Sequence, residues 1–124
     1  MTVVTALGLL AGLQIKHMLA DFWWQTAWML HDKARWGAPG GVSHAALHGG
    51  LTAAILLLFG LGPGVVVLVS LAEMLVHYHI DWAKARWSLA RGDGPGQAMF
   101  WRAIGVDQLA HQLCYLALVA LLAR

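Results

Sequence analysis

The sequence predicts an all-α integral membrane protein, folded as an up-down-up-down four-helix bundle. Of its 124 residues, 60% are hydrophobic and only 11% are charged, against about 45–50% and about 25% in soluble domains. Four apolar segments reach or approach the roughly 20 residues that a bilayer-spanning helix needs. The connections between them are short, which favours antiparallel neighbours. Residues 1–124 are therefore expected to form a single transmembrane domain.

The first predicted helix covers about residues 2–30, because its apolar first half continues through Lys16 and His17 into the segment MLADFWWQTAWML. The other three are predicted over about residues 44–61, 65–84 and 99–123. Clusters of glycine and proline are expected to break the chain between them, at residues 37–41, 60–64 and 92–96. Gly8 and Gly12 form a GxxxG pattern that permits close helix packing.

Composition also limits the partners of the chain. A formal net charge of +2 from eight basic residues is too small for a surface that tracks nucleic-acid phosphates. The single cysteine, Cys114, excludes an internal disulfide. The expected environment is the lipid bilayer, with no nucleic-acid partner.

Basic and aromatic residues predict the orientation. All seven tryptophans fall at the end of the bundle that holds the first and third connections, as in an interfacial aromatic belt. Arg124 is the one basic residue on the opposite side, so the tryptophan-rich end is predicted to be cytoplasmic and both termini non-cytoplasmic. Six basic residues lie at that predicted cytoplasmic end: Lys33, Arg35, Lys84, Arg86, Arg91 and Arg102.

Histidine and aspartate recur with a spacing of four residues inside the apolar segments. Such spacing places two side chains on one helix face, one turn apart. Random placement would give about one such pair in the chain, whereas the sequence has four at matching depth. We expect all eight side chains to converge on one layer of the bundle. The pairs are His17–Asp21, His44–His48, His77–Asp81 and Asp107–His111.

Imidazole and carboxylate are ligands for zinc, iron or manganese, so these eight residues are the predicted metal ligands. They exceed the needs of one tetrahedral ion, and two divalent ions that share a bridging aspartate would use them. Gln25, Lys84 and Gln108 are predicted to orient the ligands or to contact a substrate anion. The alternative is a metal-free network of the same residues that relays protons.

Other polar residues fit none of these pairs. His31 is expected to be a solvated loop residue, and His79 is expected to point away from the face of His77 and Asp81. The segment of residues 32–35, with Asp32 and Lys33, is predicted to be a solvated turn.

The chain resembles the bacterial Domain of Unknown Function 3307 family of small inner-membrane proteins. The resemblance implies a multi-pass protein of the bacterial inner membrane, and all eleven predicted site residues match the family pattern. It lies in four ordered segments: KHMLADFWWQTAWM (16–29), SHAALH (43–48), HYHIDWAK (77–84) and DQLAHQL (107–113).

The function predicted first is a metal-dependent hydrolase that acts on a lipid or lipid-linked substrate at the cytoplasmic leaflet. Metal ions lower the pKa of bound water and so supply a nucleophile, and a looser likeness to membrane-bound metal-dependent hydrolases places hydrolysis ahead of di-iron redox chemistry. Two other classes stay open. One is a subunit for metal or proton transport, and the other is a small accessory subunit, in a homo-oligomer or a larger membrane complex.

Overall fold

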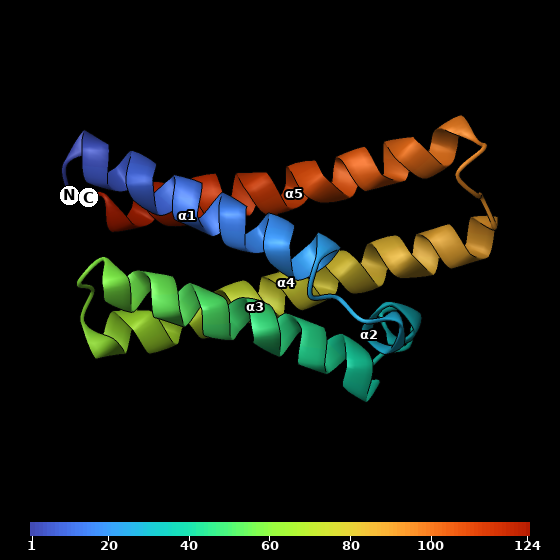
Figure 1. Cartoon of the computed structure of the whole chain (residues 1–124), viewed down its shortest axis with the longest axis horizontal. Helices are drawn as coiled ribbons and strands as arrows, with labels where there is room; N and C mark the ends of the chain where they lie inside the picture. The colour runs from blue at the N-terminus through green and yellow to red at the C-terminus, as the bar shows by residue number, and fades with distance from the viewer.

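The structure is a computed structural model that describes all 124 residues, and it is all-helical. Four of the helices are long, and Figure 1 shows them aligned with the long axis of the molecule. The two termini and the α3–α4 connection lie at one end, whereas α2 and the α4–α5 connection lie at the other. The five helices are α1 (Val3–Phe22), α2 (Ala27–Asp32), α3 (Pro39–Leu58), α4 (Pro63–Arg91) and α5 (Ala98–Leu122).

The long helices form a closed ring of neighbours, as the up-down-up-down prediction requires. Helix α1 packs against α3 and α5, and α4 packs against the same two helices. All four are long and apolar enough to cross a membrane. The chain is therefore a multi-pass membrane protein, and a lipid bilayer surrounds the bundle.

The continuous helix predicted over residues 2–30 is wrong. Helix α1 ends at Phe22, and α2 begins only at Ala27. The hydroxyl of Thr26 accepts the backbone N–H of Met29 at 3.2 Å, which is the contact that starts a new helix. Apolar content alone does not reveal this break, because the tryptophans on both sides of it are as hydrophobic as the residues of a continuing helix.

Helix α3 begins earlier than predicted, at Pro39 instead of residue 44, so the glycines that follow lie inside its first turn. The carboxylate of Asp32 accepts the backbone N–H of Gly40 at 2.9 Å. A Cβ on Gly40 would lie 2.8 Å from the carbonyl oxygen of Trp28, so only glycine lets α2 approach this closely. Asp32 is 2% exposed, and its prediction as part of a solvated turn is wrong.

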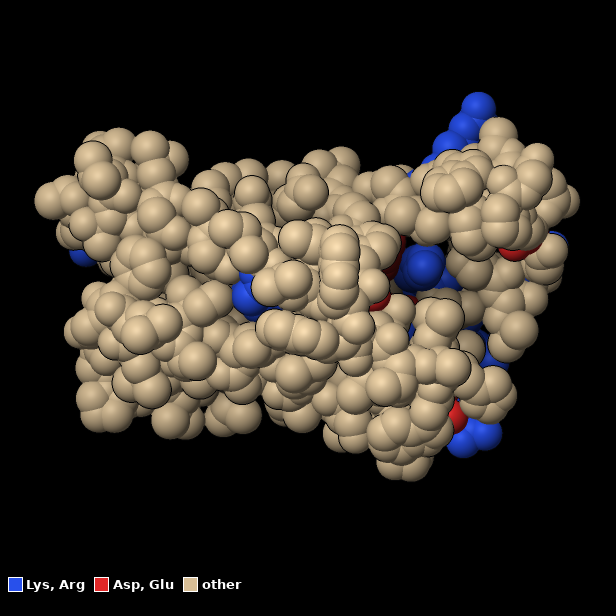
Figure 2. Space-filling view, in the orientation of Figure 1, with Lys and Arg blue, Asp and Glu red and all other residues tan.

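Helix α4 is longer than predicted and ends at Arg91, and the left-handed φ of 68° at the following Gly92 accommodates the helix stop. Lys84, Arg86 and Arg91 therefore lie on helix α4 and not in the connection that follows it. In Figure 2 most of the basic and acidic atoms gather at the end of the molecule that holds α2 and the α4–α5 connection. A hollow at that end contains atoms of both signs.

The interior has two parts. The half near the termini is a conventional apolar cluster that includes Leu9, Leu13 and Leu56. The other half is polar. Over the whole chain, thirteen buried residues are polar or charged, whereas nine are hydrophobic. Helices α3 and α4 come close at Gly49, where a Cβ would lie 3.1 Å from the Cβ of Met74. The GxxxG glycines leave a looser fit, since a Cβ on Gly8 would meet nothing nearer than 3.5 Å.

The contact between Asp32 and Gly40 predicts that acid weakens the packing of α2 against α3. The Gly40 N–H holds the pKa of the Asp32 carboxyl below its ordinary value of 3.8, and His31 and Arg35 add to this against the opposing effect of burial. Because the folded-state pKa is the lower one, the stabilisation is complete above pH 3.8 and is lost as pH falls through the folded-state value.

We expect thermal unfolding in detergent to show this loss below about pH 4. Asp32→Asn should remove that part of the pH dependence and slightly lower the unfolding temperature at pH 6. The protein and the variant should converge at low pH. An equal pH dependence in both would contradict the assignment.

Candidate metal centre

The structure brings the four predicted pairs into one layer, with α1, α3, α4 and α5 each supplying one pair. Each pair spans a single helical turn, and all eight side chains are at most 9% exposed. Their convergence follows from sequence, because antiparallel helices bring residues at matching depth to the same level. The eight are His17, Asp21, His44, His48, His77, Asp81, Asp107 and His111.

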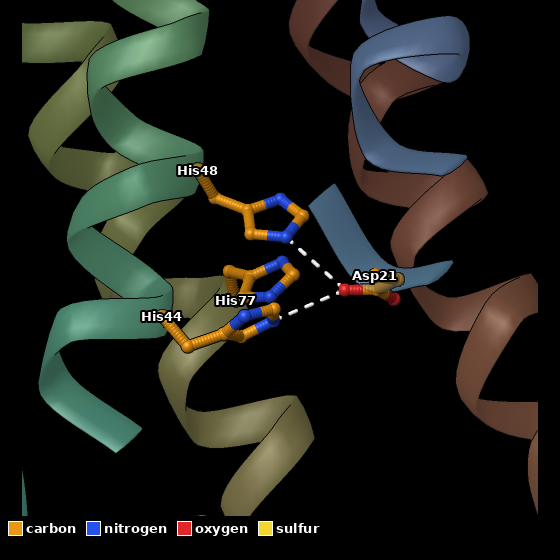
Figure 3. A group of neighbouring side chains, drawn as sticks. All are labelled: Asp21, His44, His48 and His77. Carbon is orange, nitrogen blue, oxygen red and sulfur yellow. Dashed lines mark hydrogen bonds and ion pairs between the residues drawn. The ribbon is translucent and has the colours of Figure 1, made fainter. Parts of the chain in front are cut away.

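Asp21 is the first centre of this layer. Its Oδ1 lies 3.0 Å from Nε2 of His44 and 3.1 Å from Nε2 of His48 (Figure 3). Its other oxygen lies 3.2 Å from Nε2 of His17 and 3.3 Å from Nε2 of Gln108. One carboxylate from α1 therefore binds side chains of α3 and α5.

Asp81 is the second centre. Its Oδ1 lies 3.3 Å from Nε2 of His111. Its Oδ2 lies 3.1 Å from Nε2 of His77 and 3.3 Å from Nε2 of His44. His44 thus stands between the two carboxylates. Asp107 lies further out, with 3.7 Å between its Oδ1 and Nε2 of His111.

His77 occupies the middle of the layer. Its ring stacks on that of His48 with 3.6 Å between centroids, and the ring of His111 is 4.3 Å away. The side chain is 1% exposed, yet neither ring nitrogen has a hydrogen-bond partner. The ring nitrogen near Asp81 is close enough for a hydrogen bond but is not aligned for one. Such a group normally costs free energy.

The separations between donor atoms fit metal coordination. Bonds of roughly 2.0–2.1 Å in a tetrahedral site place neighbouring ligand atoms about 3.3 Å apart, and the contacts around Asp21 and Asp81 measure 3.0–3.3 Å. Three sets of donors have all their ligand atoms within 4.8 Å of one another: Asp21–His44–His48–His77, His17–His77–His111 and Asp81–Asp107–His111.

The three predicted supporting residues have different positions. The carbonyl oxygen of Gln108 lies 3.2 Å from Nε2 of His17, and its amide donates to Asp21 and Asp107. Gln25 donates only to the backbone carbonyl of Asp21. Lys84 makes no hydrogen bond or ion pair with any of the eight, and it lines a groove between α4 and α5 together with Asp107.

Lys33 is a site residue that sequence reasoning missed. Its Nζ lies 2.8 Å from Oδ2 of Asp81, and its side chain is 10% exposed. Its prediction as part of a solvated turn is therefore wrong, because the chain after α2 folds back over the layer. The predicted exposure of His31 and the predicted orientation of His79 are confirmed, but His31 lies on helix α2 and not in a loop. The side chain of His31 is 73% exposed, and His79 lies on the outer face of α4 against Trp36.

A second group of buried polar residues borders the layer on its deeper side. Nζ of Lys16 donates to Oε1 of Glu73 at 3.0 Å and to Nδ1 of His48 at 3.3 Å. The hydroxyls of Tyr115 and Thr52 donate to the same carboxylate at 3.1 and 3.4 Å. The sequence does indicate three residues of this group: Thr52, Glu73 and Tyr115. Each lies four residues from a histidine of the layer and so extends that pair by one further helical turn.

Comparison with known proteins places the chain in a family. The family described as "Protein of unknown function (DUF3307)" matches residues 9–123, and the chain belongs to it. This confirms the resemblance seen in the four segments. No curated protein and no solved structure matches the chain.

The buried pair of Lys16 and Glu73 predicts an asymmetry between single and double substitutions. Glu73→Gln leaves the Lys16 ammonium buried without its counter-charge, and removal of one partner of a buried pair costs about 3–5 kcal/mol. Replacement of both, as in Lys16→Met/Glu73→Leu, is expected to cost much less than Glu73→Gln. Unfolding in mixed detergent micelles would measure the difference. A double variant as unstable as Glu73→Gln would contradict a coupled pair.

Proposed function

We propose that the polar layer binds two divalent metal ions, from among zinc, iron and manganese, and that the protein is a metal-dependent hydrolase. The observation that best supports this proposal concerns His77. Both its ring nitrogens are buried without hydrogen bonds, and one of them lies 3.1 Å from a carboxylate oxygen of Asp81. A cation shared by the two groups accounts for that arrangement, because both then direct lone pairs at one point.

Two ions suit the way the donors are distributed. Asp21 gathers imidazoles from α1 and α3, Asp81 gathers them from α3, α4 and α5, and His44 lies within 3.3 Å of both carboxylates. In two-metal sites the ions lie roughly 3.5–4 Å apart and share ligands. Asp21 or Asp81 would then be the ligand that the two ions share. Gln108 is the best-placed supporting residue, because it contacts both His17 and Asp21.

The seam between α4 and α5 supports the proposed substrate class. A cavity of about 300 Å³ reaches His77, His111 and Tyr115 from this seam, and nine of its twelve lining residues are hydrophobic. An apolar entrance that ends at polar donors suits a lipid or lipid-linked substrate. Bound ions would polarise the scissile group and lower the pKa of a water. Oδ1 of Asp107, which has no hydrogen-bond partner, is placed to accept the proton.

Transport of protons or metal is the second candidate. A continuous polar path favours it: Glu73 contacts Lys16, Lys16 contacts His48, and His48 is joined to Asp81 through Asp21 and His44. Beyond Glu73, however, the interior becomes the apolar cluster around Leu9 and Leu56. A path connected to one face only favours chemistry at that face over passage across the membrane.

The proposal includes a location in the bacterial inner membrane, with the polar end of the bundle in the cytoplasm. Reporter fusions test this orientation, which rests on the positive-inside rule. A reporter fused after Arg124 is expected to be active outside the cytoplasm, and one inserted at Gly94 is expected to be active inside. The opposite pattern would place the layer at the outer leaflet.

Metal analysis of the purified protein tests the proposed function. We expect about two equivalents of divalent metal per chain, and His44→Ala/His48→Ala should lose at least one of them. The matched control is His31→Ala/His79→Ala, which also removes two histidines, both outside the layer. A wild-type protein that neither retains metal nor binds added zinc, iron or manganese would refute the proposal. So would equal loss in both double variants.

A further inference from the structure

A second groove lies between α4 and α5, closer to the charged end of the bundle. Its volume is about 470 Å³, and seven of its ten lining residues are hydrophobic. Its polar members are Lys84 on α4, and Arg102 and Asp107 on α5. Trp87 contributes an aromatic wall at the same end.

The two cations of this groove have no acidic partner. At the same end of the molecule, Lys33 pairs with Asp81, and Arg35 and Arg91 pair with neighbouring aspartates. Neither Lys84 nor Arg102 takes part in any ion pair, and the nearest acid in the groove, Asp107, is 8% exposed. Two free cations beside an apolar channel are complementary to an anion that carries a hydrocarbon chain.

We propose that this groove binds an anionic phospholipid, with its phosphate on Lys84 and Arg102 and an acyl chain along Ile80 and Val106. Free phosphate would leave the apolar lining of the groove uncovered. A zwitterionic lipid would bring an ammonium group next to two cations, so a lipid with net negative charge is favoured. The tryptophans at this end mark the depth at which headgroups lie.

The groove also adjoins the metal centre. Asp107 lines the groove and approaches His111 with 3.7 Å between the two side chains, and it accepts the amide of Gln108. A lipid phosphate in the groove would therefore lie beside the proposed ligands. If the bound lipid is taken to be the substrate, this inference rests on the proposed hydrolase function. The lipid-binding site itself does not depend on that function.

The test is lipid retention by the full-length protein. Delipidated protein in detergent is mixed with phosphatidylglycerol or phosphatidylcholine, and the bound lipid is counted by native mass spectrometry. We expect wild type to prefer phosphatidylglycerol, and Lys84→Gln/Arg102→Gln to weaken its binding about tenfold or more, since each cation contributes a favourable contact. Because neither residue makes an ion pair, this variant is expected to fold.

The matched control is Arg35→Gln/Arg86→Gln, which removes the same charge at the same end of the molecule from residues that do not line the groove. It should change phosphatidylglycerol binding less than about twofold. Equal binding of the two lipids by wild type, or equal losses in the two double variants, would overturn the site. Metal content measured on the same samples separates the two proposals: selective lipid binding without metal would retain the groove and remove the hydrolase.

Discussion

A charged side chain inside a bilayer must have a partner, and this constraint determines how the helices of this protein meet. Lipid gives transmembrane helices no hydrophobic reason to associate, so interhelical hydrogen bonds and packing hold them together. Asp21 ties α1 to α3 and α5 through His44 and Gln108. Asp81 ties α4 to α3 and α5 through His44 and His111. The same contacts that hold the bundle also form the candidate site.

The structure of the polar end of the bundle depends on the position at which α1 ends. The helix ends at Phe22, one residue after Asp21, whereas α4 continues to Arg91. The space beyond α1 is occupied by α2, which packs on α3, and the chain that follows carries Lys33 back to Asp81. Glycine at position 40 permits this close return. A continuous first helix would have left Asp81 without its ammonium partner.

Sequence alone predicted the bundle and the layer because both arise from periodic patterns. Apolar runs gave the four spans, and a four-residue spacing placed His17, Asp21 and the other six donors on inward faces. The break after Phe22 was missed because Trp23 and Trp24 continue the apolar run on which the helix prediction relied. Lys33 was missed for another reason, since its approach to Asp81 depends on the path of a connection, which no periodicity records. Lys16 faces inward beside His17, and only packing shows that Glu73 balances it.

The charge of the layer connects the proposed metals to the proposed lipid. With neutral imidazoles, the carboxylates of Asp21, Asp81, Asp107 and Glu73 outnumber the ammonium groups of Lys16 and Lys33. An excess of negative charge is costly in a low-dielectric interior, and it would repel a phosphate. Two divalent ions would reverse the excess and leave the layer positive, so that an anionic headgroup beside Asp107 would complete the neutralisation. The ions would then strengthen the binding of an anionic substrate as well as supply catalysis.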